Sequence, residues 1–382
     1  MKNFLRAMAM LTLAGAAAAC QQQEPTIAGN LIGPTSIVQS GRRMLISTRE
    51  ANEVRVLSLE GEQTSFVRAP NPLYPLSVPT APLPQSLGAW TGPGGTDTAP
   101  YALALSTVAA QVSVIDTGTL TLLGSFAVPD TALSVTVTAF APGSAARGVI
   151  AVSQAGQGAL YVAQLPPALR DNPAAVAEVQ PTLAVGLGAS VPQFVLASPT
   201  DPDLVAVGDR QVGDDGFGRA GGLVLVNVAT GAVERFDVGG PILRLSFEPT
   251  GQRVYGILDA EACEGRRCTG VFGFDVGART LLPGAAAAPV EVPGVLRGVA
   301  VGAADTVGGV ALEPVVLVSS TDGNLYVVDG GAMRVLDLDP AGASVAETFH
   351  LEPDGTRNEV GGGPTNVEVR EGAVRTERIN VA

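Results

Sequence analysis

The sequence predicts an all-β protein built from repeated units, and three observations support this fold class. A short apolar strand recurs seven times, at an average spacing of about 55 residues, each time with a companion hairpin. The chain contains 47 glycines and 28 prolines among 382 residues, and charged residues make up only 15%. The strands are rich in β-branched residues and are bounded by turn pairs such as Asp-Gly and Gly-Gly, which supply the positive φ that hairpins need. Repeated four-stranded antiparallel units of this kind are typical of a single β-propeller.

The leading strands of the units determine the expected number of blades. They begin at Thr35, Leu87, Leu133, Pro192, Ile242, Leu296 and Thr365. The first six units contain four candidate strands each, whereas the seventh contains only residues 365–370 and 373–380. A strand near residues 26–31 would complete it by pairing the two chain ends, and closure would leave no long unpaired edge. The sequence therefore predicts seven blades and leaves six open.

The strands inside the units follow the same pattern from blade to blade. In the second unit, residues 105–107 end one strand, residues 112–116 form the next, and residues 122–128 return after a turn at 117–119. The other clear strands are residues 222–228 and 233–238 in the fourth unit, 271–276 in the fifth, and 315–320 and 325–329 in the sixth. Glycine-containing turns separate them, as hairpins require.

The segment ValSerValIleAsp at 112–116, followed by a Thr-Gly turn, resembles the blades of the YVTN-type β-propeller family. Residues 52–59 and 324–329 are similar to the same pattern. The Tyr-Val-Thr-Asn tetrad itself is altered, to LeuIleSerThr at 45–48 and AlaLeuSerThr at 104–107. The resemblance implies the propeller architecture over nearly all of 30–380. It implies no particular activity, because propellers carry many unrelated functions.

The N-terminus reads as an export signal. Lys2 and Arg6 precede an apolar run over residues 8–19, which is too short for a permanent membrane span. The small residues before Cys20 resemble a bacterial lipobox, in which that cysteine is lipidated; the alternative is an ordinary signal peptide cleaved near Ala19. By the same resemblance, Gln21 implies sorting to the outer membrane. The expected organisation is a signal peptide at 1–19, a lipidated tether at 20–33 and the propeller at 34–382.

Two of the three cysteines remain after Cys20 is assigned to lipid. Cys263 and Cys268 lie close together in GluAlaCysGluGlyArgArgCysThr. In an oxidising compartment such a pair usually forms a disulfide. The alternative, a metal-binding pair, lacks further thiols or histidines nearby.

The charge of the chain restricts its partners. The formal net charge is −13, and it becomes −15 once Lys2 and Arg6 leave with the signal. Such an acidic chain without a basic stripe repels nucleic acid, so none is expected as a partner. The expected partners are a protein or glycan of the cell envelope and the membrane itself, through the lipid, and we expect a monomer.

The longest insertions indicate where a binding site lies. Strand direction alternates across a blade, so turns between the second and third strands share one face with the blade-to-blade connections. The sequence places residues 69–86 and 339–363 in connections, and residues 209–221 and 259–269 in second-to-third-strand turns. All four insertions would then gather on one face, and loops on a rigid scaffold often carry function. The candidate binding residues are Tyr74, Asp209, Arg210, Asp214, Asp215, Arg219, Glu264, Arg266 and Arg267.

The insertions suggest ligands only weakly. Asp214 and Asp215 leave a calcium ion open, although no DxDxDG loop is present and a solvated glycine-rich turn is the simpler interpretation. Arg266 and Arg267 suit a carboxylate or phosphate, or are simply exposed on a constrained loop. No other cofactor or metal site is expected.

The sequence offers little for catalysis. His350 is the single histidine, which argues against a catalytic triad or a multi-histidine metal site, and no GxSxG motif is present. Trp90 is expected on an inner strand as a packing residue. We therefore expect a non-catalytic binding or scaffolding module of the cell envelope, an outer-membrane lipoprotein facing the periplasm or the cell surface. The alternative is a propeller hydrolase or lactonase that uses carboxylates at the axial channel.

Overall fold

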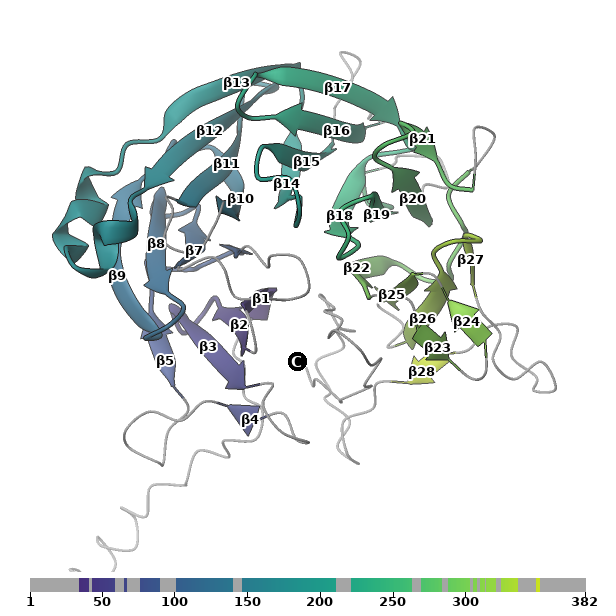
Figure 1. Cartoon of the computed structure of the whole chain (residues 1–382), viewed down its shortest axis with the longest axis horizontal. Coiled ribbons are helices and arrows are strands. Elements are labelled where there is room, and N and C mark those ends of the chain that lie inside the picture. The colour runs from purple at the N-terminus through teal and green to yellow at the C-terminus, as the bar shows by residue number, and fades with distance from the viewer. Residues whose placement is uncertain are drawn as a thin grey trace, which may run out of the picture.

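The computed structural model describes residues 34–40, 43–58, 65–66, 76–89, 101–139, 146–210, 221–262, 269–283, 288–302, 305–307, 310–312, 314–320, 324–335 and 348–350. These residues fold almost entirely into β-strands. Two short 3₁₀ helices, η2 (Pro167–Arg170) and η3 (Pro173–Glu178), lie at the outside of the ring beside β9 (Figure 1). None of the helices in the described part of the chain has the length and apolar character needed to cross a bilayer.

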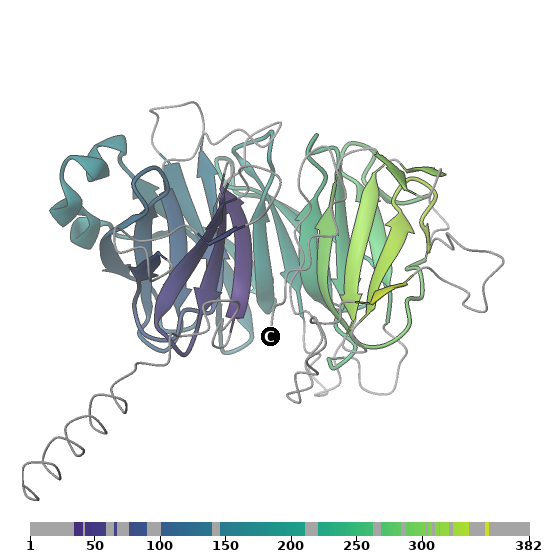
Figure 2. The same ribbon diagram turned by 90° about the horizontal axis from the view of Figure 1, so that it is seen from below.

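The strands form six antiparallel sheets that stand side by side as the blades of a propeller (Figure 1). In each blade the first strand lies nearest the axis and the fourth lies outermost. The strands cross the thickness of the ring, as its side view shows (Figure 2).

The strand bounds of blades I to III are as follows. Blade I contains β1 (Pro34–Ser40), β2 (Arg43–Thr48), β3 (Glu53–Ser58), β4 (Ser65–Phe66) and β5 (Ser77–Pro79). Blade II contains β6 (Ser86–Gly88), β7 (Tyr101–Ser106), β8 (Gln111–Asp116) and β9 (Thr121–Ala127). Blade III contains β10 (Ala132–Ala139), β11 (Ala146–Gln154), β12 (Gln157–Leu165) and β13 (Thr182–Ala189).

Blades IV to VI continue the same order. Blade IV contains β14 (Pro192–Ala197), β15 (Leu204–Asp209), β16 (Gly222–Asn227) and β17 (Ala232–Asp237). Blade V contains β18 (Ile242–Phe247), β19 (Arg253–Leu258), β20 (Val271–Asp275) and β21 (Thr280–Leu281). Blade VI contains β22 (Leu296–Val301), β25 (Val315–Ser320), β26 (Asn324–Asp329), β27 (Arg334–Val335) and β28 (Thr348–His350). A hairpin of β23 (Asp305–Val307) and β24 (Val310–Leu312) is inserted between β22 and β25.

The predicted all-β propeller with four-stranded antiparallel blades is confirmed, with six blades in the described residues. Six is the smaller of the two numbers that the sequence left open. The first strands of these blades begin at the predicted positions or one residue earlier. The seventh leading strand, at Thr365, and the strand near residues 26–31 lie outside the described residues.

The outer strands of blades I and VI are each split in two. Both β4 and β5 pair antiparallel with β3, so residues 67–76 interrupt one outer strand. Likewise β27 and β28 both pair with β26, and residues 336–347 interrupt the other. The prediction that residues 69–86 and 339–363 are blade-to-blade connections is therefore wrong in part, because each range contains a piece of an outer strand. Pairing with a distant strand, which the local pattern does not reveal, decided this.

The hydrophobic core is divided among the interfaces between successive blades. Five apolar clusters occupy the interfaces from I–II to V–VI. In β16, Val224 and Val226 belong to the cluster shared with blade III, whereas Leu223 and Leu225 belong to the cluster shared with blade V. Both faces of a middle strand are thus buried, which explains why these strands read as continuous apolar runs.

Acidic or amide side chains cap the turns between the third and fourth strands in four blades. Asp116, Asn227, Asp275 and Asp329 each end a third strand, and each accepts hydrogen bonds through its side-chain oxygen from backbone N–H groups two or three residues later. These Asx turns replace backbone pairing where the chain reverses. They explain the Asp-Thr-Gly pattern that the sequence shows after 112–116.

The first strands share a β-bulge near the end at which they begin. The register between first and second strands shifts by one residue in blades I, III, IV, V and VI, which leaves one extra residue on the inner strand. The extra residues are Thr35, Leu133, Gln193, Leu243 and Arg297. A bulge turns a side chain away from the regular alternation, so these positions differ in direction from the rest of their strands.

Serine hydroxyls join the inner strands of blades I to IV. Ser36 accepts a hydrogen bond from the Leu87 N–H at 3.2 Å, and Ser86 accepts one from the Val135 N–H at 3.2 Å. Ser134 continues the series and accepts from Val195 at 3.3 Å. The equivalent residues of blades IV and V, which follow the bulge in the same way, are Phe194 and Arg244.

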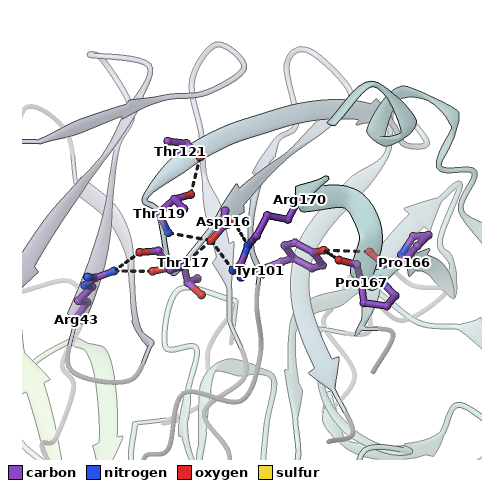
Figure 3. Close-up of polar contacts among 10 residues, drawn as sticks. Arg43, Tyr101, Asp116, Thr117, Thr119, Thr121, Pro166, Pro167 and Arg170 are labelled. Atoms are coloured by element: carbon purple, nitrogen blue, oxygen red, sulfur yellow. Dashed lines mark hydrogen bonds and ion pairs between the residues drawn. The ribbon is translucent and has the colours of Figure 1, made fainter. Parts of the chain in front are cut away.

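Arginines tie neighbouring blades together on the face that carries the third-to-fourth-strand turns, here called the turn face (Figure 3). Arg170 of blade III forms hydrogen bonds with both oxygens of the buried Asp116 in blade II, one of them at 2.8 Å. Arg43 of blade I donates to the carbonyls of Thr117 and Gly118 at 2.7 and 3.2 Å. Three blades are thereby linked through one turn.

The Asp116 carboxyl makes stability depend on pH. Burial alone would raise its pKa, but hydrogen bonds from Arg170, Thr119 and Gly118 outweigh burial and lower the pKa below the usual value. Its contribution is therefore complete above the unfolded-state pKa of about 4 and is lost as the pH falls through the lowered pKa. We expect Asp116→Asn to cost about 2 kcal/mol of unfolding free energy at pH 7, and less at pH 3. Denaturant unfolding at both pH values measures this; exposed Asp130→Asn is the control, and a pH-independent loss would contradict the assignment.

A tight approach of two inner strands gives a second prediction. A Cβ at Gly88 would lie 2.6 Å from the Thr136 Cα atom, whereas one at exposed Gly186 would meet no atom within 4 Å. Gly88→Ala should therefore lower the free energy of unfolding by about 2 kcal/mol through overpacking, and Gly186→Ala should leave it nearly unchanged. Urea titrations of both variants test this. Equal losses of unfolding free energy would show that the two inner strands move apart to accommodate a Cβ atom at position 88.

Candidate functional site

The structure describes only part of the predicted site. Asp209 and Arg210 lie at the end of β15, where the insertion before β16 begins. The other candidates lie outside the described residues: Tyr74, Asp214, Asp215, Arg219, Glu264, Arg266 and Arg267. The same holds for Cys20, Cys263, Cys268 and Trp90. Their assigned roles stay predictions.

The stems of two of the four predicted insertions lie on the same face of the ring. Residues 211–220 connect β15 to β16, and residues 263–268 lie between β19 and β20. Both are connections from a second to a third strand, so their stems are at the end of the ring opposite the turn face. We call this end the loop face. The first strands also begin here, which places their bulges beside the two stems.

Asp209 anchors the stem of the first insertion. Its carboxylate is almost fully buried; one oxygen accepts a hydrogen bond from the Val191 N–H at 2.8 Å, and the other accepts one from Arg235 at 2.9 Å. The Arg210 N–H in turn donates to the Val191 carbonyl at 2.9 Å. Asp209 is thus a structural residue, and Arg210 is the side chain that this stem presents.

Two ion pairs cross the blade boundaries on the loop face. The Nε atom of Arg210 in blade IV lies 3.5 Å from an oxygen of Asp259 in blade V. Asp259 is buried, and its other oxygen accepts backbone hydrogen bonds from Glu261 and Ala262. Arg297 of blade VI donates to the exposed Glu261 at 2.7 Å. The stem of the second insertion is thereby held between its two neighbouring blades.

Arg244 lies on the inner strand β18 of blade V, the blade that both pairs join to a neighbour. Its guanidinium carbon is 5.3 Å from the centre of the Phe194 ring on β14, and one of its nitrogens donates to the Leu243 carbonyl at 3.1 Å. Burial is the main cause that lowers the pKa of Arg244; Asp259 opposes the shift and Arg297 adds to it. The residue is surrounded by protein and still keeps some exposed surface.

The charges of this group do not balance. We define the loop-face cluster as Arg210, Arg244 and Arg297 together with the carboxylates of Asp259 and Glu261. Three positive groups therefore face two negative ones in a chain whose formal net charge is −13. No carboxylate in the described residues forms an ion pair with Arg244. The cluster offers guanidinium donors to an anion rather than a pair of carboxylates to a proton-transfer reaction.

Of the five residues of the loop-face cluster, the sequence analysis predicted only Arg210. It also predicted Asp209, which anchors the neighbouring stem. Asp259 and Glu261 fall within the predicted insertion 259–269 and were not singled out, and Arg244 and Arg297 were not considered. A signal was present, because these two arginines are the charged residues of the described inner strands, whose other residues are uncharged. A charge inside an inner strand is costly unless it is paired or used.

Other predicted chemistry has little structural counterpart in the described residues. His350 lies in β28, opposite Asn324 in the ladder with β26. Within the part of the chain that the structure describes, no group of three or more histidine, cysteine, aspartate or glutamate residues is placed to hold a metal ion.

Comparison with known proteins identifies the fold alone. No protein-family model and no curated protein matches the chain. Among solved structures, hydrazine synthase of Kuenenia stuttgartiensis is similar with a TM-score of 0.53 and 14% identity, over 80% of this chain and 79% of that one. A functionally unknown protein from Desulfotomaculum acetoxidans gives 0.51 and 10%, over 80% and 85%. BBS1N, solved in complex with ARL6DN, gives 0.50 and 10%, over 81% and 84%.

The imbalance at Arg244 predicts a stabilising substitution. A desolvated guanidinium without a carboxylate partner costs free energy, and an apolar side chain of similar length would also pack on Phe194. We expect Arg244→Met to raise the free energy of unfolding by about 1 kcal/mol. The matched control, Arg279→Met, removes an exposed ion pair with Glu234 on the turn face and should lower it by less than about 1 kcal/mol. Denaturant unfolding of both variants tests this; a loss above about 2 kcal/mol at Arg244 would mean that its charge is paired in the folded protein.

Proposed function

We propose that this protein is a non-catalytic binding or scaffolding module of the bacterial cell envelope, a propeller whose loop face binds a protein or glycan partner. The observation that carries this proposal is the loop-face cluster. It gathers the stems of two insertions and an inner-strand arginine at one end of the ring. Arginines join neighbouring blades on both faces, but only the loop face adds Arg244, which has no carboxylate partner among the described residues.

The envelope location comes from the sequence. The signal-like residues 1–19 and the lipobox-like Cys20 imply a lipid anchor at the outer membrane, facing the periplasm or the cell surface. A lipid at residue 20 would leave the short segment 21–33 between membrane and ring. The proposed partner is therefore another component of the envelope.

The energetics of the loop face support binding more than catalysis. Asp259 and Glu261 each bind an arginine, which holds Arg210 and Arg297 in fixed positions on the loop face. Arg244 remains with unused hydrogen-bond donors, and protein interfaces are enriched in arginine at their centres. No described contact favours the hydrolase alternative.

Site-specific photocrosslinking in cells tests the proposed face. Glu261 on the loop face and Glu234 on the turn face form a matched pair, since both are exposed and both bind an arginine of the next blade. A photoreactive residue at position 261 should yield a discrete adduct that is absent from position 234. Protease or glycosidase digestion of the adduct then identifies its class.

The opposite labelling pattern would contradict the proposal. Adducts from position 234 alone, or equal labelling from both positions, would contradict the assignment of the loop face as the partner-binding surface. Absence of any adduct at either position, under conditions in which the protein is anchored and folded, would contradict a stable partner.

A further inference from the structure

Arg244 has more hydrogen-bond donors than the described structure uses. A guanidinium carries five N–H donors in one plane. The contacts of Arg244 with described residues use one donor, for the Leu243 carbonyl at 3.1 Å, and place the guanidinium carbon 5.3 Å from the centre of the Phe194 ring. No other hydrogen bond of Arg244 is found among the described residues. The group is therefore held in position while most of its donors stay open.

The nearest carboxylate is engaged elsewhere. Asp259 influences Arg244 electrostatically, but one of its oxygens accepts hydrogen bonds from the Glu261 and Ala262 N–H groups, and the other pairs with Arg210. Arg297, a second positive group near Arg244, binds Glu261. The cluster thus leaves one positive charge without a partner among the described residues.

The overall charge limits the anion that this site accepts. A chain with a formal net charge of −13 repels extended polyanions, and that field is screened beyond about 8 Å at physiological ionic strength. Within this distance the three arginines of the loop-face cluster outnumber its two carboxylates. A compact anion on an uncharged or basic carrier can therefore approach, whereas a polyuronate or a nucleic acid is disfavoured.

We propose that Arg244, stacked on Phe194 and flanked by Arg297, binds a single carboxylate group of a partner polypeptide on the loop face. The planar fork of the guanidinium matches the two oxygens of a carboxylate, which forms two parallel charge-assisted hydrogen bonds. This inference rests on the proposed function and names the chemistry by which the loop face recognises its partner. The carboxylate is supplied by a chain terminus or by an aspartate or glutamate side chain.

Small carboxylates test the site directly. N-acetylglycine mimics a chain terminus, acetylated and amidated glutamate mimics a side chain, and N-acetylglycinamide is the uncharged control. Calorimetric titration of the purified protein should show saturable binding of at least one carboxylate, with a dissociation constant of about 1 mM, and none of the amide. Whichever of the two carboxylates binds identifies the source of the carboxylate, a chain terminus or a side chain.

Substitutions assign the binding to Arg244. Arg244→Met should weaken the affinity at least tenfold, and Arg244→Lys should lose most of it because a lysine keeps the charge without the fork. Arg279→Met, on the turn face, should bind like the unmodified protein. As a second measurement, the bound carboxylate should protect Arg244 but not Arg279 from phenylglyoxal, read by peptide mass spectrometry.

Several results would overturn the proposal: no saturable binding, equal binding of the amide, or unchanged affinity in folded Arg244→Met. Binding of polygalacturonate at a lower concentration than the small carboxylates would also overturn the proposal, in favour of a glycan partner. These outcomes are distinct from failure of the proposed function. Photocrosslinks confined to position 261 without carboxylate binding would overturn only the role of Arg244, and carboxylate binding without face-specific crosslinks would overturn only the docking face.

Discussion

The packing of one sheet face against the next is the constraint on which this structure depends. Every interface from blade I to blade VI is filled by its own apolar cluster, and the middle strands contribute to two clusters at once. A strand buried on both faces has no room for charge, so charged groups are pushed to the strand ends. Within the described residues, the ion pairs that join neighbouring blades lie at the two faces of the ring.

The two faces use their arginines differently. On the turn face, Arg170, Arg147 and Arg279 each pair with a carboxylate of a neighbouring blade, so their charges are satisfied within the fold. On the loop face, similar pairs at Arg210 and Arg297 hold the stem of an insertion, and Arg244 is added without a carboxylate among the described residues. An unsatisfied charge that the fold does not need is a cost to stability, and such costs are common at functional sites.

The repeated architecture explains how one position can be changed without disturbing the rest. Ser36, Ser86 and Ser134 occupy the same place in successive inner strands, and each joins its strand to the next one. Phe194 and Arg244 replace serine at this place in blades IV and V, where stacking of the guanidinium on the ring replaces the hydroxyl contact. Because each blade contacts mainly its neighbours, a local change of this kind leaves the other interfaces intact.

The all-β class, the four-stranded unit and the starts of six inner strands can be predicted from the sequence, because alternation and turn residues act over a few neighbouring positions. The sequence also placed the stems at Asp209 and Asp259 on one face, since strand direction alternates regardless of packing. Only the tertiary structure decided that the outer strands of blades I and VI are split, because strand pairing joins residues far apart in the chain. It alone brought Arg210, Arg244, Asp259 and Arg297 together, since they lie in three blades and meet only when the ring forms.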